Sequence, residues 1–563
     1  MKRSKSSVNT PRERERERLR ETIGTSTITA TGIDMSEVEA PLLYDVAESS
    51  VDFKGCPAVR SKSGCWKSAS FIIGVEMAER FAYYGISSNL VSYLTGPLGQ
   101  STAAAAANVN AWSGTAFLSP LVGAFIADSY LGKYRTVIIA SLLYIMGLGF
   151  LSLSAALHSD KARSPPQPQI IFFFCSLYLV ALAQGGHKPC LQAFGAEQFD
   201  ESDEDECKAK SSFFNWWNFC LCASVVVGLL VLSYIQDNMS WELGFGIPCI
   251  VMCLALIVFL LGSMTYRFHV HGDSRNPFLR ISRVFVDAAK NWRFLDKALL
   301  EPNGSKDAAC SIIDIEDAKT ILKILPICLA CLPYSIIYSQ SSTLFTKQGS
   351  TMDRHITTSF QIPAAALQSF TAASLVLFIP IYERVLVPVA RAVSRKPSGI
   401  SMLQRIGAGI FLSVISMVVA GCIENKRLAT ATEYGLVDSP EVTLPMSVWW
   451  LAPQYLVLGV ADVFTLVGIQ EFVYDQVPSD LKSMGLALCL GVVGTGSFLS
   501  SFLVSVIDRA TGGGDGDESW FSNNLNRAHL DYFYWVLAGI GALSCVLFVY
   551  FARSYVYIRR NGV

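Results

Sequence analysis

Long apolar blocks alternate with short polar segments through most of the 563-residue chain. Each block holds about 20 mostly apolar residues, the length that an α-helix needs to cross the hydrocarbon of a bilayer. Twelve such blocks can be marked, and we predict a membrane-spanning helix in each. They cover approximately residues 70–94, 105–127, 134–157, 169–190, 212–235, 243–266, 321–346, 360–382, 402–423, 448–471, 484–507 and 531–556.

Lysine and arginine residues are concentrated in alternate connecting segments, beginning with the tail before the first block. These residues mark the cytoplasmic side of a membrane protein, so both termini are expected to be cytoplasmic. The one long connection carries apolar and basic residues that fit an amphipathic helix on the inner leaflet. We therefore predict a largely disordered N-terminal tail (1–69), a six-helix bundle (70–266), this cytoplasmic linker (267–320) and a second six-helix bundle with a short tail (321–563).

Composition narrows the classes of function. Hydrophobic residues make up 51% of the chain and charged residues 16%, against about a quarter charged in soluble domains. The net charge of −1 lacks the basic balance of a nucleic-acid binder, so no nucleic-acid partner is expected. The sequence contains no phosphate-binding loop, HExxH motif or dinucleotide fingerprint. The partners that we expect are therefore the lipid bilayer and a small molecule or ion; the sequence leaves the oligomeric state open.

Six blocks plus six around a cytoplasmic loop is the arrangement of the major facilitator transporters, whose substrate lies between two halves. The fold class expected is thus an all-α membrane protein with 12 transmembrane helices and the major facilitator fold. A receptor or a membrane enzyme with the same number of helices is the alternative. The ionisable residues inside the blocks discriminate between these classes.

The first block contains three ionisable residues, Glu76, Glu79 and Arg80, in the stretch FIIGVEMAERFAYYG. Each such residue costs roughly 2.5 to 3.5 kcal/mol on insertion, so it points to function. Helical spacing places Glu76 beside both of the others, and two carboxylates that share one guanidinium cannot both be fully compensated. We expect one of them to bind a proton near neutral pH, as a proton-coupling site requires; an inert triad that fixes helix packing is the alternative.

Lys188 lies near the inner end of the fourth block, where two glycines and Pro189 loosen the helix. A lysine at this place can exchange partners between the Glu76/Glu79 pair and a bound anion, or it can extend to the cytoplasmic interface. Its neighbour His187 fits a packing role better than a proton relay.

The tenth block carries Asp462 at depth and Glu471 near its cytoplasmic end. Because Glu471 matches the depth of Lys188 in the opposite half, we expect a gate salt bridge between them. Asp462 either contacts the substrate or caps a kink at Gly459. Arg405, at the inner edge of the ninth block, is expected to extend to the interface.

Polar and aromatic residues complete the expected substrate site. Tyr83 and Tyr84 lie in the first block, and Tyr338 and Gln340 in the seventh. Aromatic residues at such positions also serve as core or as an interfacial belt, which is the competing interpretation.

The segment GAFIADSYLGKYRT joins the second and third blocks. It places Asp128 at the inner end of a span, Gly132 in a tight turn and Lys133 directly after it. We expect a charged cytoplasmic hinge that helps to hold one conformational state; ordinary interfacial anchoring is the alternative.

A series of segments resembles the plant nitrate transporter 1/peptide transporter family, within the proton-coupled oligopeptide transporters. In chain order these are EMAERFAYYG, GAFIADSYLGKY, GGHKPCLQAFGAEQFD, FFNWWNF, SYIQDNMSWELGFGIP, RFLDKALL, LQRIGAG, QEFVYDQVP and NLNRAHLDYFYW. The resemblance runs from about residue 50 to the C-terminus. It implies symport by alternating access, with protons as the coupling ion and no other cofactor. It also implies that Glu76, Glu79 and Arg80 match the ExxER motif, Lys188 its partner lysine and Glu471 the glutamate associated with that lysine.

The resemblance is weaker at the substrate. A well-studied nitrate carrier of the family has a histidine where this chain has Tyr338, and bacterial peptide carriers have an arginine where it has Ser87. The stretch GPLGQSTAAAAANVNAWSGTA is most like the fifth plant subfamily, so we expect a nitrate symporter of the plasma or vacuolar membrane, with Arg80, Lys188, Tyr338 and Gln340 around the substrate. Dipeptides, tripeptides or a small organic anion such as a hormone are the alternative substrates, and a transporter-like sensor is the alternative class.

Overall fold

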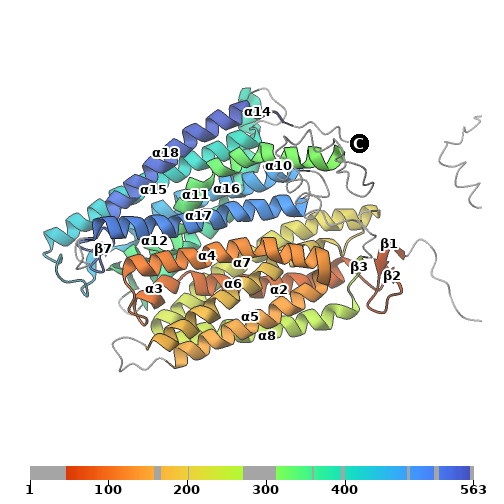
Figure 1. Ribbon diagram of the computed structural model, residues 1–563, viewed down its shortest axis with the longest axis horizontal. Helices are drawn as coiled ribbons and strands as arrows, with labels where there is room; N and C mark the ends of the chain where they lie inside the picture. The colour runs from red at the N-terminus through yellow and green to blue at the C-terminus, as the bar shows by residue number, and fades with distance from the viewer. Residues whose placement is uncertain are drawn as a thin grey trace, which may run out of the picture. The chain divides into compact units, whose positions relative to one another are not determined.

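The computed structural model consists mainly of long helices that run side by side (Figure 1). It describes residues 46–157, 166–200, 202–269, 312–357, 360–394, 400–477, 482–512 and 519–557. Residues Ala47–Val563 form one compact unit. Ten helices of the described part are long and apolar enough to cross a membrane, and a bent pair, Ala318–Ala330 with Leu332–Ser350, makes up to eleven. An all-α membrane fold is thereby confirmed, whereas the count of twelve spans stays a prediction.

The first predicted span is not among these helices because of its charges. Its main helix, α2 (Cys65–Ser87), has 23 residues and is followed by the short helix α3 (Leu90–Thr95). Glu76, Glu79 and Arg80 lie together near the centre of α2, so its apolar content is interrupted. A bilayer accepts such a cluster only where the charges are paired and turned into the protein.

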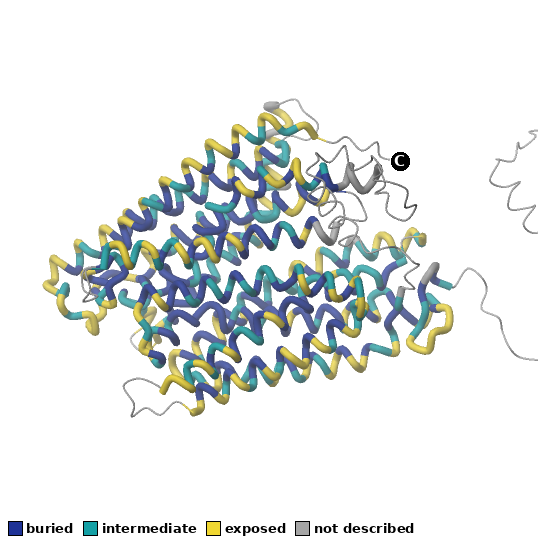
Figure 2. Tube along the Cα trace, viewed as in Figure 1, coloured by how far each residue is buried: buried dark blue, intermediate teal, exposed yellow. Residues whose placement is uncertain are grey.

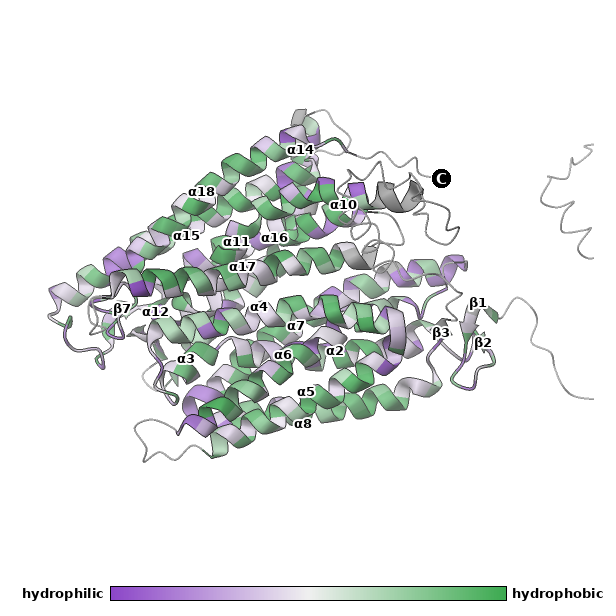
Figure 3. Ribbon diagram, in the orientation of Figure 1, coloured by the Kyte–Doolittle hydropathy of each residue, from purple (hydrophilic) through white to green (hydrophobic). Residues whose placement is uncertain are grey.

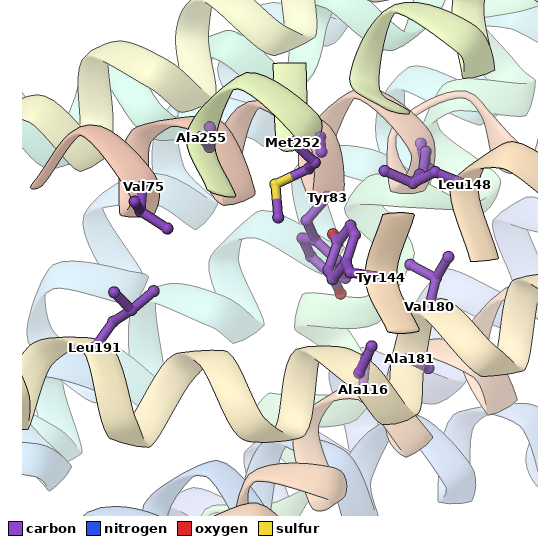
Figure 4. Packing of buried hydrophobic residues seen from close by; sticks show 14 of the residues in the cluster. Val75, Tyr83, Ala116, Tyr144, Leu148, Val180, Ala181, Leu191, Met252 and Ala255 are labelled. Carbon is purple, nitrogen blue, oxygen red and sulfur yellow. The ribbon is translucent and has the colours of Figure 1, made fainter. Parts of the chain in front are cut away.

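The remaining helices before residue 270 pack into one bundle with α2. They are α4 (Thr102–Ile126), the π-helical turn η1 (Ala127–Leu131), α5 (Lys133–Ala156), α6 (Gln167–Ala196), α7 (Glu204–Asn238), α8 (Trp241–Leu261) and the turn η2 (Gly262–Met264). α2 packs on α7 and α8, while α6 packs on α4 and α5. Side chains from α2, α4, α5, α6 and α8 form a single buried cluster, which includes Tyr83, Tyr144 and Leu191 (Figure 4). We call this bundle the N-terminal half.

The C-terminal half is built from the helices after residue 311. They are α10 (Ile312–Ala330), α11 (Leu332–Tyr338), η4 (Ser339–Ser342), α12 (Leu344–Ser350), η5 (Ala364–Gln368), α13 (Ser369–Ile381), η6 (Tyr382–Leu386), α14 (Val387–Ser394), α15 (Met402–Glu433), η7 (Val448–Leu451), α16 (Ala452–Gln476), α17 (Lys482–Thr511) and α18 (Leu530–Ser554). The predicted seventh span is bent by 45° between α10 and α11. Pro333 contributes to this break, because a proline lacks the N–H that would continue the helix ladder.

The hydropathy of the residues changes along the length of the helices. Figure 3 shows hydrophobic residues along the middle of the helices and hydrophilic residues gathered toward their ends. Many helices carry exposed residues along their length (Figure 2). Large apolar side chains are among them, for example Leu182 (60% exposed) and Leu377 (68%). Exposed apolar surface of this kind fits contact with lipid acyl chains.

Short strands lie outside the helices. A three-stranded sheet has the order β2 (Pro57–Val59), β1 (Val46–Val51) and β3 (Phe268–His269). Two strand pairs join β4 (Met352–Asp353) to β7 (Leu444–Ser447) in parallel and β5 (His355–Thr357) to β6 (Phe360–Gln361) in antiparallel orientation.

The prediction of a largely disordered tail (1–69) is wrong for its last part, because that part contains strands of the first sheet. Residues 47–64 are held by strand pairing and by Arg60, which pairs with Asp200 at 2.6 Å. The hydrogen bond to Asp200 raises the pKa of Arg60 above its usual value. The rest of the tail (1–45) and the predicted amphipathic helix of the linker, in residues 270–311, lie outside the described residues.

Polar contacts join the two halves at one end of the helices. The helix bundle has two ends. We call the end at which α2 begins and α18 ends the terminal end, and the opposite one the far end (Figure 1). At the far end Gln368 donates to the carbonyl of Ser88 at 2.9 Å and Lys347 to Thr95 at 3.0 Å. Further links there are Thr102 with Asn523, Asp237 with Arg354 and the stacked rings of Tyr234 and Phe360. The structure is therefore a state in which the halves are joined at the far end.

Candidate functional site

The charged cluster of α2 forms as its spacing predicts. The guanidinium Nε of Arg80 lies 2.6 Å from Glu76 Oε1 and 3.2 Å from Glu79 Oε2. All three residues are buried, and Glu79 has no exposed surface. One carboxylate oxygen of each glutamate, Oε2, has no hydrogen-bond partner among the described residues. One cation thus faces two carboxylates, and a single bound proton would make the group neutral.

Gln184 of α6 is a member of this site that the sequence analysis missed. Its side-chain amide donates to Glu79 Oε1 at 2.8 Å, and both residues are fully buried. The signal was an amide residue inside an apolar block, one helical turn before Lys188. His187 packs on the ring of Tyr144 and shares a hydrogen bond of 3.0 Å with Ser141, which fits the predicted packing role.

Lys188 projects toward aromatic rings of the same half. Its Nζ lies 4.9 Å from the ring centre of Tyr83 and 4.3 Å from that of Phe117. Within the described ranges it forms no ion pair, so the ammonium is held by cation–π contacts and keeps its donors for another anion.

The predicted salt bridge between Lys188 and Glu471 is not formed in this structure. Glu471 pairs with Arg405 at 2.7 Å, because α15 packs directly on α16 within the C-terminal half. Arg405 also donates to the carbonyl of Val463 at 3.0 Å and lies 4.6 Å from the ring centre of Tyr382. The prediction that Arg405 extends to the interface is wrong, since it is only 8% exposed.

The predicted aromatic residues meet where the halves face each other. The side chains of Tyr84 and Tyr338 lie close enough to interact, which places α2 beside α11. Tyr83 is buried and stacks on Trp112 with ring centres 5.4 Å apart. Tyr84 and Tyr338 are each half-buried.

Gln340 is predicted to bind substrate, but its side-chain amide is hydrogen-bonded within the protein. Its amide nitrogen donates to the carbonyl of Ile336 at 2.8 Å and to the hydroxyl of Ser500 at 2.9 Å. Asn110 of α4 donates to the same hydroxyl at 3.0 Å. Both hydrogens of the Gln340 amide are therefore used, and in this state it holds α11, α17 and α4 together instead of offering a donor to a substrate.

The predicted charged hinge lies in the turn between α4 and α5. Asp128 belongs to the π-helical turn η1, and Gly132 follows with φ of 74°, a backbone conformation that favours glycine. Lys133 forms an ion pair with Glu197 at the end of α6, a partner that the sequence analysis did not identify. The hinge residues are thus tied to a third helix.

Asp462 is buried in α16 and accepts a hydrogen bond from the hydroxyl of Tyr334. α16 runs as one α-helix from Ala452 to Gln476, without a break at Gly459. Gly459 instead lets α13 approach: a side-chain carbon there would lie 2.8 Å from the carbonyl oxygen of Thr371. In the described residues there is no group of three or more metal-ligating side chains.

The chain is similar to known members of one family. A family model described as PTR2, POT family, matches residues 134–521. The chain is 58% identical to Protein NRT1/ PTR FAMILY 5.10 of Arabidopsis thaliana, over 93% of this chain and 98% of that relative. It is 53% identical to Protein NRT1/ PTR FAMILY 5.12 of the same plant, over 94% and 99%.

Solved structures with the same fold carry similar descriptions. A crystal structure of an auto-inhibited POT family peptide transporter gives a TM-score of 0.69 at 22% identity, covering 88% of this chain and 98% of that one. The POT family transporter PepTSo gives 0.67 at 21% identity, covering 87% and 98%. At this level of identity the likeness concerns the fold alone, and it confirms the predicted major facilitator type of fold but not the count of twelve helices.

Proposed function

Because the chain belongs to the POT family, a family of multi-pass membrane transporters and not of enzymes, we propose that it moves nitrate together with protons by alternating access. The observation that carries this proposal is the pair of carboxylates on one guanidinium, near a lysine, Lys188, that has no ion pair within the described ranges. The carboxylates supply a proton site, and the two cations supply places for an anion. The expected membrane is the plasma or vacuolar membrane, with both termini cytoplasmic.

The proton site is Glu76, Glu79 and Arg80. With both glutamates ionised the group carries a net negative charge inside the membrane, which is costly. Binding one proton removes that charge and weakens the hold of the carboxylates on Arg80. The guanidinium is then able to share its charge with a substrate anion, so proton binding favours anion binding.

The anion would be held between Arg80 and Lys188. The ammonium of Lys188 lies over two rings, and no carboxylate of the described residues forms an ion pair with it. A small anion suits this arrangement, because two cations and aromatic walls can replace its hydration shell. Tyr83, Tyr84 and Tyr338 form the aromatic border, and Gln340 becomes a substrate donor only if its bond to Ser500 opens.

Alternating access requires the halves to part at the far end. The bonds from Gln368 to Ser88 and from Lys347 to Thr95 would then break. Closure at the terminal end would bring Lys188 toward Glu471, which must first exchange Arg405 for the lysine. Asp128, Gly132 and Lys133 would stabilise the state shown here through the bond of Lys133 to Glu197.

Proteoliposomes with the purified protein test the transport function. An inside-alkaline pH gradient is expected to drive nitrate accumulation, and excess dipeptide should leave it unchanged. Dipeptide accumulation in place of nitrate would move the proposal to the alternative of peptide symport. Nitrate binding without accumulation would indicate the other alternative, a transporter-like sensor.

Replacing Lys188 with methionine is expected to lower nitrate uptake at least tenfold. Methionine keeps the long apolar stem that packs on Tyr83 and Phe117 but removes the charge. Uptake at saturating and at low nitrate separates a loss of affinity from a loss of turnover. Lys208, which is 68% exposed, provides a matched control as Lys208→Met and should transport normally. Unchanged nitrate affinity in Lys188→Met would remove this lysine from the substrate site.

A further inference from the structure

A small polar cavity lies in the C-terminal half at the far end. Its volume is about 220 Å³, and its walls come from the end of α12, the segment before β7 and the segment before α18. Figure 1 shows α12 and β7 at this end of the molecule. Most of the lining residues are polar, and two of them, Lys347 and Glu441, carry opposite charges. A cavity of this size and polarity suits a small charged molecule rather than an apolar one.

The two charges of the cavity do not pair with each other. The ammonium of Lys347 donates to the hydroxyl of Thr95, a neutral acceptor, at 3.0 Å. Among the described residues no carboxylate forms an ion pair with Lys347, and no cation forms one with Glu441, which is exposed. An ammonium carries three donors, so donors of Lys347 remain for a ligand. The cavity therefore presents one cation and one anion to the same small volume.

The asparagines of the wall are fixed by bonds within the protein. The side-chain amide of Asn524 donates to the carbonyl of Val437 at 2.8 Å, and that of Asn526 donates to the carbonyl of Leu436 at 2.9 Å. The side-chain oxygen of Asn526 accepts from Arg427 at 2.9 Å. This wall is thus held in place before a ligand arrives, which lowers the entropy cost of binding.

The same walls form two of the contacts that join the halves. Lys347 donates to Thr95, and the side-chain oxygen of Asn523 accepts from the backbone N–H of Thr102 at 3.0 Å. Thr95 and Thr102 both belong to the N-terminal half. A carboxylate placed in the cavity would compete with Thr95 for the ammonium of Lys347. Such a ligand binds more tightly once the halves part at the far end, because Lys347 is then free of Thr95.

We propose that this cavity is a binding site for a small zwitterion, a free amino acid whose carboxylate binds Lys347 and whose ammonium binds Glu441. The two charges of such a ligand complement the two charges of the cavity, whereas an anion alone would face the carboxylate of Glu441 without a partner for it. Binding of the zwitterion favours the state that is parted at the far end, and parting favours binding to the same extent. The site is separate from the place proposed for the transported anion, between Arg80 and Lys188.

Binding of radiolabelled glycine and 4-aminobutanoate, a short and a long zwitterion, tests the site on the full-length protein in nanodiscs without nitrate. At least one of them is expected to bind. Lys347→Met and Glu441→Gln should each weaken that binding by at least about tenfold, since each removes a charged hydrogen-bond partner. Glu441 is exposed, so its variant should fold. Lys426→Met, at an exposed lysine of the same half that lies over the ring of Trp450, is the matched control and should bind like the wild type.

Three results of this assay would overturn the proposal. They are no binding of either zwitterion, binding that survives unchanged in both variants, and binding of acetate as tight as that of the zwitterion, which would indicate a simple anion site. Because the assay contains no nitrate and measures no transport, a failure of the proposed nitrate symport would leave its result intact.

Thr95→Val tests the link between the cavity and the contact of the halves. Valine keeps the shape of threonine but cannot accept the bond from Lys347. The affinity for the zwitterion is therefore expected to rise severalfold. Spin labels on the two halves at the far end should also move apart when the zwitterion is added to the wild type. An affinity that is unchanged in Thr95→Val, or an unchanged distance between the labels, would overturn the coupling.

Discussion

Replacing Glu79 with glutamine is expected to abolish pH-driven nitrate accumulation. The carboxylate is fully buried between Arg80, at 3.2 Å, and the amide of Gln184, at 2.8 Å. Glutamine has nearly the same shape, so the fold should survive. It carries no charge, however, and leaves Arg80 paired with Glu76 alone, in a neutral group that has no reason to bind a proton. We expect at least a hundredfold loss, measured as nitrate uptake into proteoliposomes under a pH gradient.

The control for this variant is Glu204→Gln, at a carboxylate that is 87% exposed at the start of α7. It should transport like the wild type. Thermal unfolding of both variants in detergent distinguishes a coupling defect from misfolding. Uptake by Glu79→Gln that still follows the pH gradient would remove Glu79 from the proton site and leave Glu76 as the remaining candidate.

Replacing Arg427 with methionine is expected to destabilise the protein by about 3 to 5 kcal/mol. The side chains of Arg427 and Glu424 are completely buried on α15, and Arg427 Nη2 lies 2.6 Å from Glu424 Oε1. Arg427 also donates to the carbonyl of Leu525 at 2.6 Å, and Glu424 accepts from Gln348 at 2.7 Å. Removing the guanidinium leaves a buried carboxylate without its cation, and that uncompensated charge sets the size of the loss. Chemical or thermal unfolding in detergent measures it.

A second substitution tests whether the isolated charge is the cause. The double variant Glu424→Gln with Arg427→Met has no buried charge at this place, so it should recover at least half of the lost stability. If the double variant is no more stable than Arg427→Met, the cost comes from lost packing and from the bonds to Leu525 and Asn526. A single variant as stable as the wild type would contradict the prediction outright.

The burial of Glu424 and Arg427 could not be predicted from the sequence. The ninth apolar block ends at about residue 423, so its bounds place both charges in the connecting segment that follows. In the structure α15 continues to Glu433, and β7, α12 and the segment before α18 cover its end. Hydropathy measures the transfer of single residues to lipid, whereas this end of the helix is enclosed by protein.

Local spacing was reliable where the interacting residues belong to one helix. Glu76, Glu79 and Arg80 meet because residues four apart share a helix face, whatever surrounds them. Spacing did not predict the partners of Arg405, Glu471 and Lys188, because these residues contact other helices. Several helices stand at a similar depth, and depth alone does not say which of them are neighbours.

The sequence by itself determined the membrane class, the helical fold and the charged centre of α2, because apolar length and helical period are local properties of the chain. Only the tertiary structure decided that Glu471 pairs with Arg405, that Gln340 donates to Ile336 and Ser500, and that Asp462 accepts a hydrogen bond from Tyr334. These contacts depend on which helices pack together and on the state of the two halves, and neither is encoded in the spacing of residues along one helix.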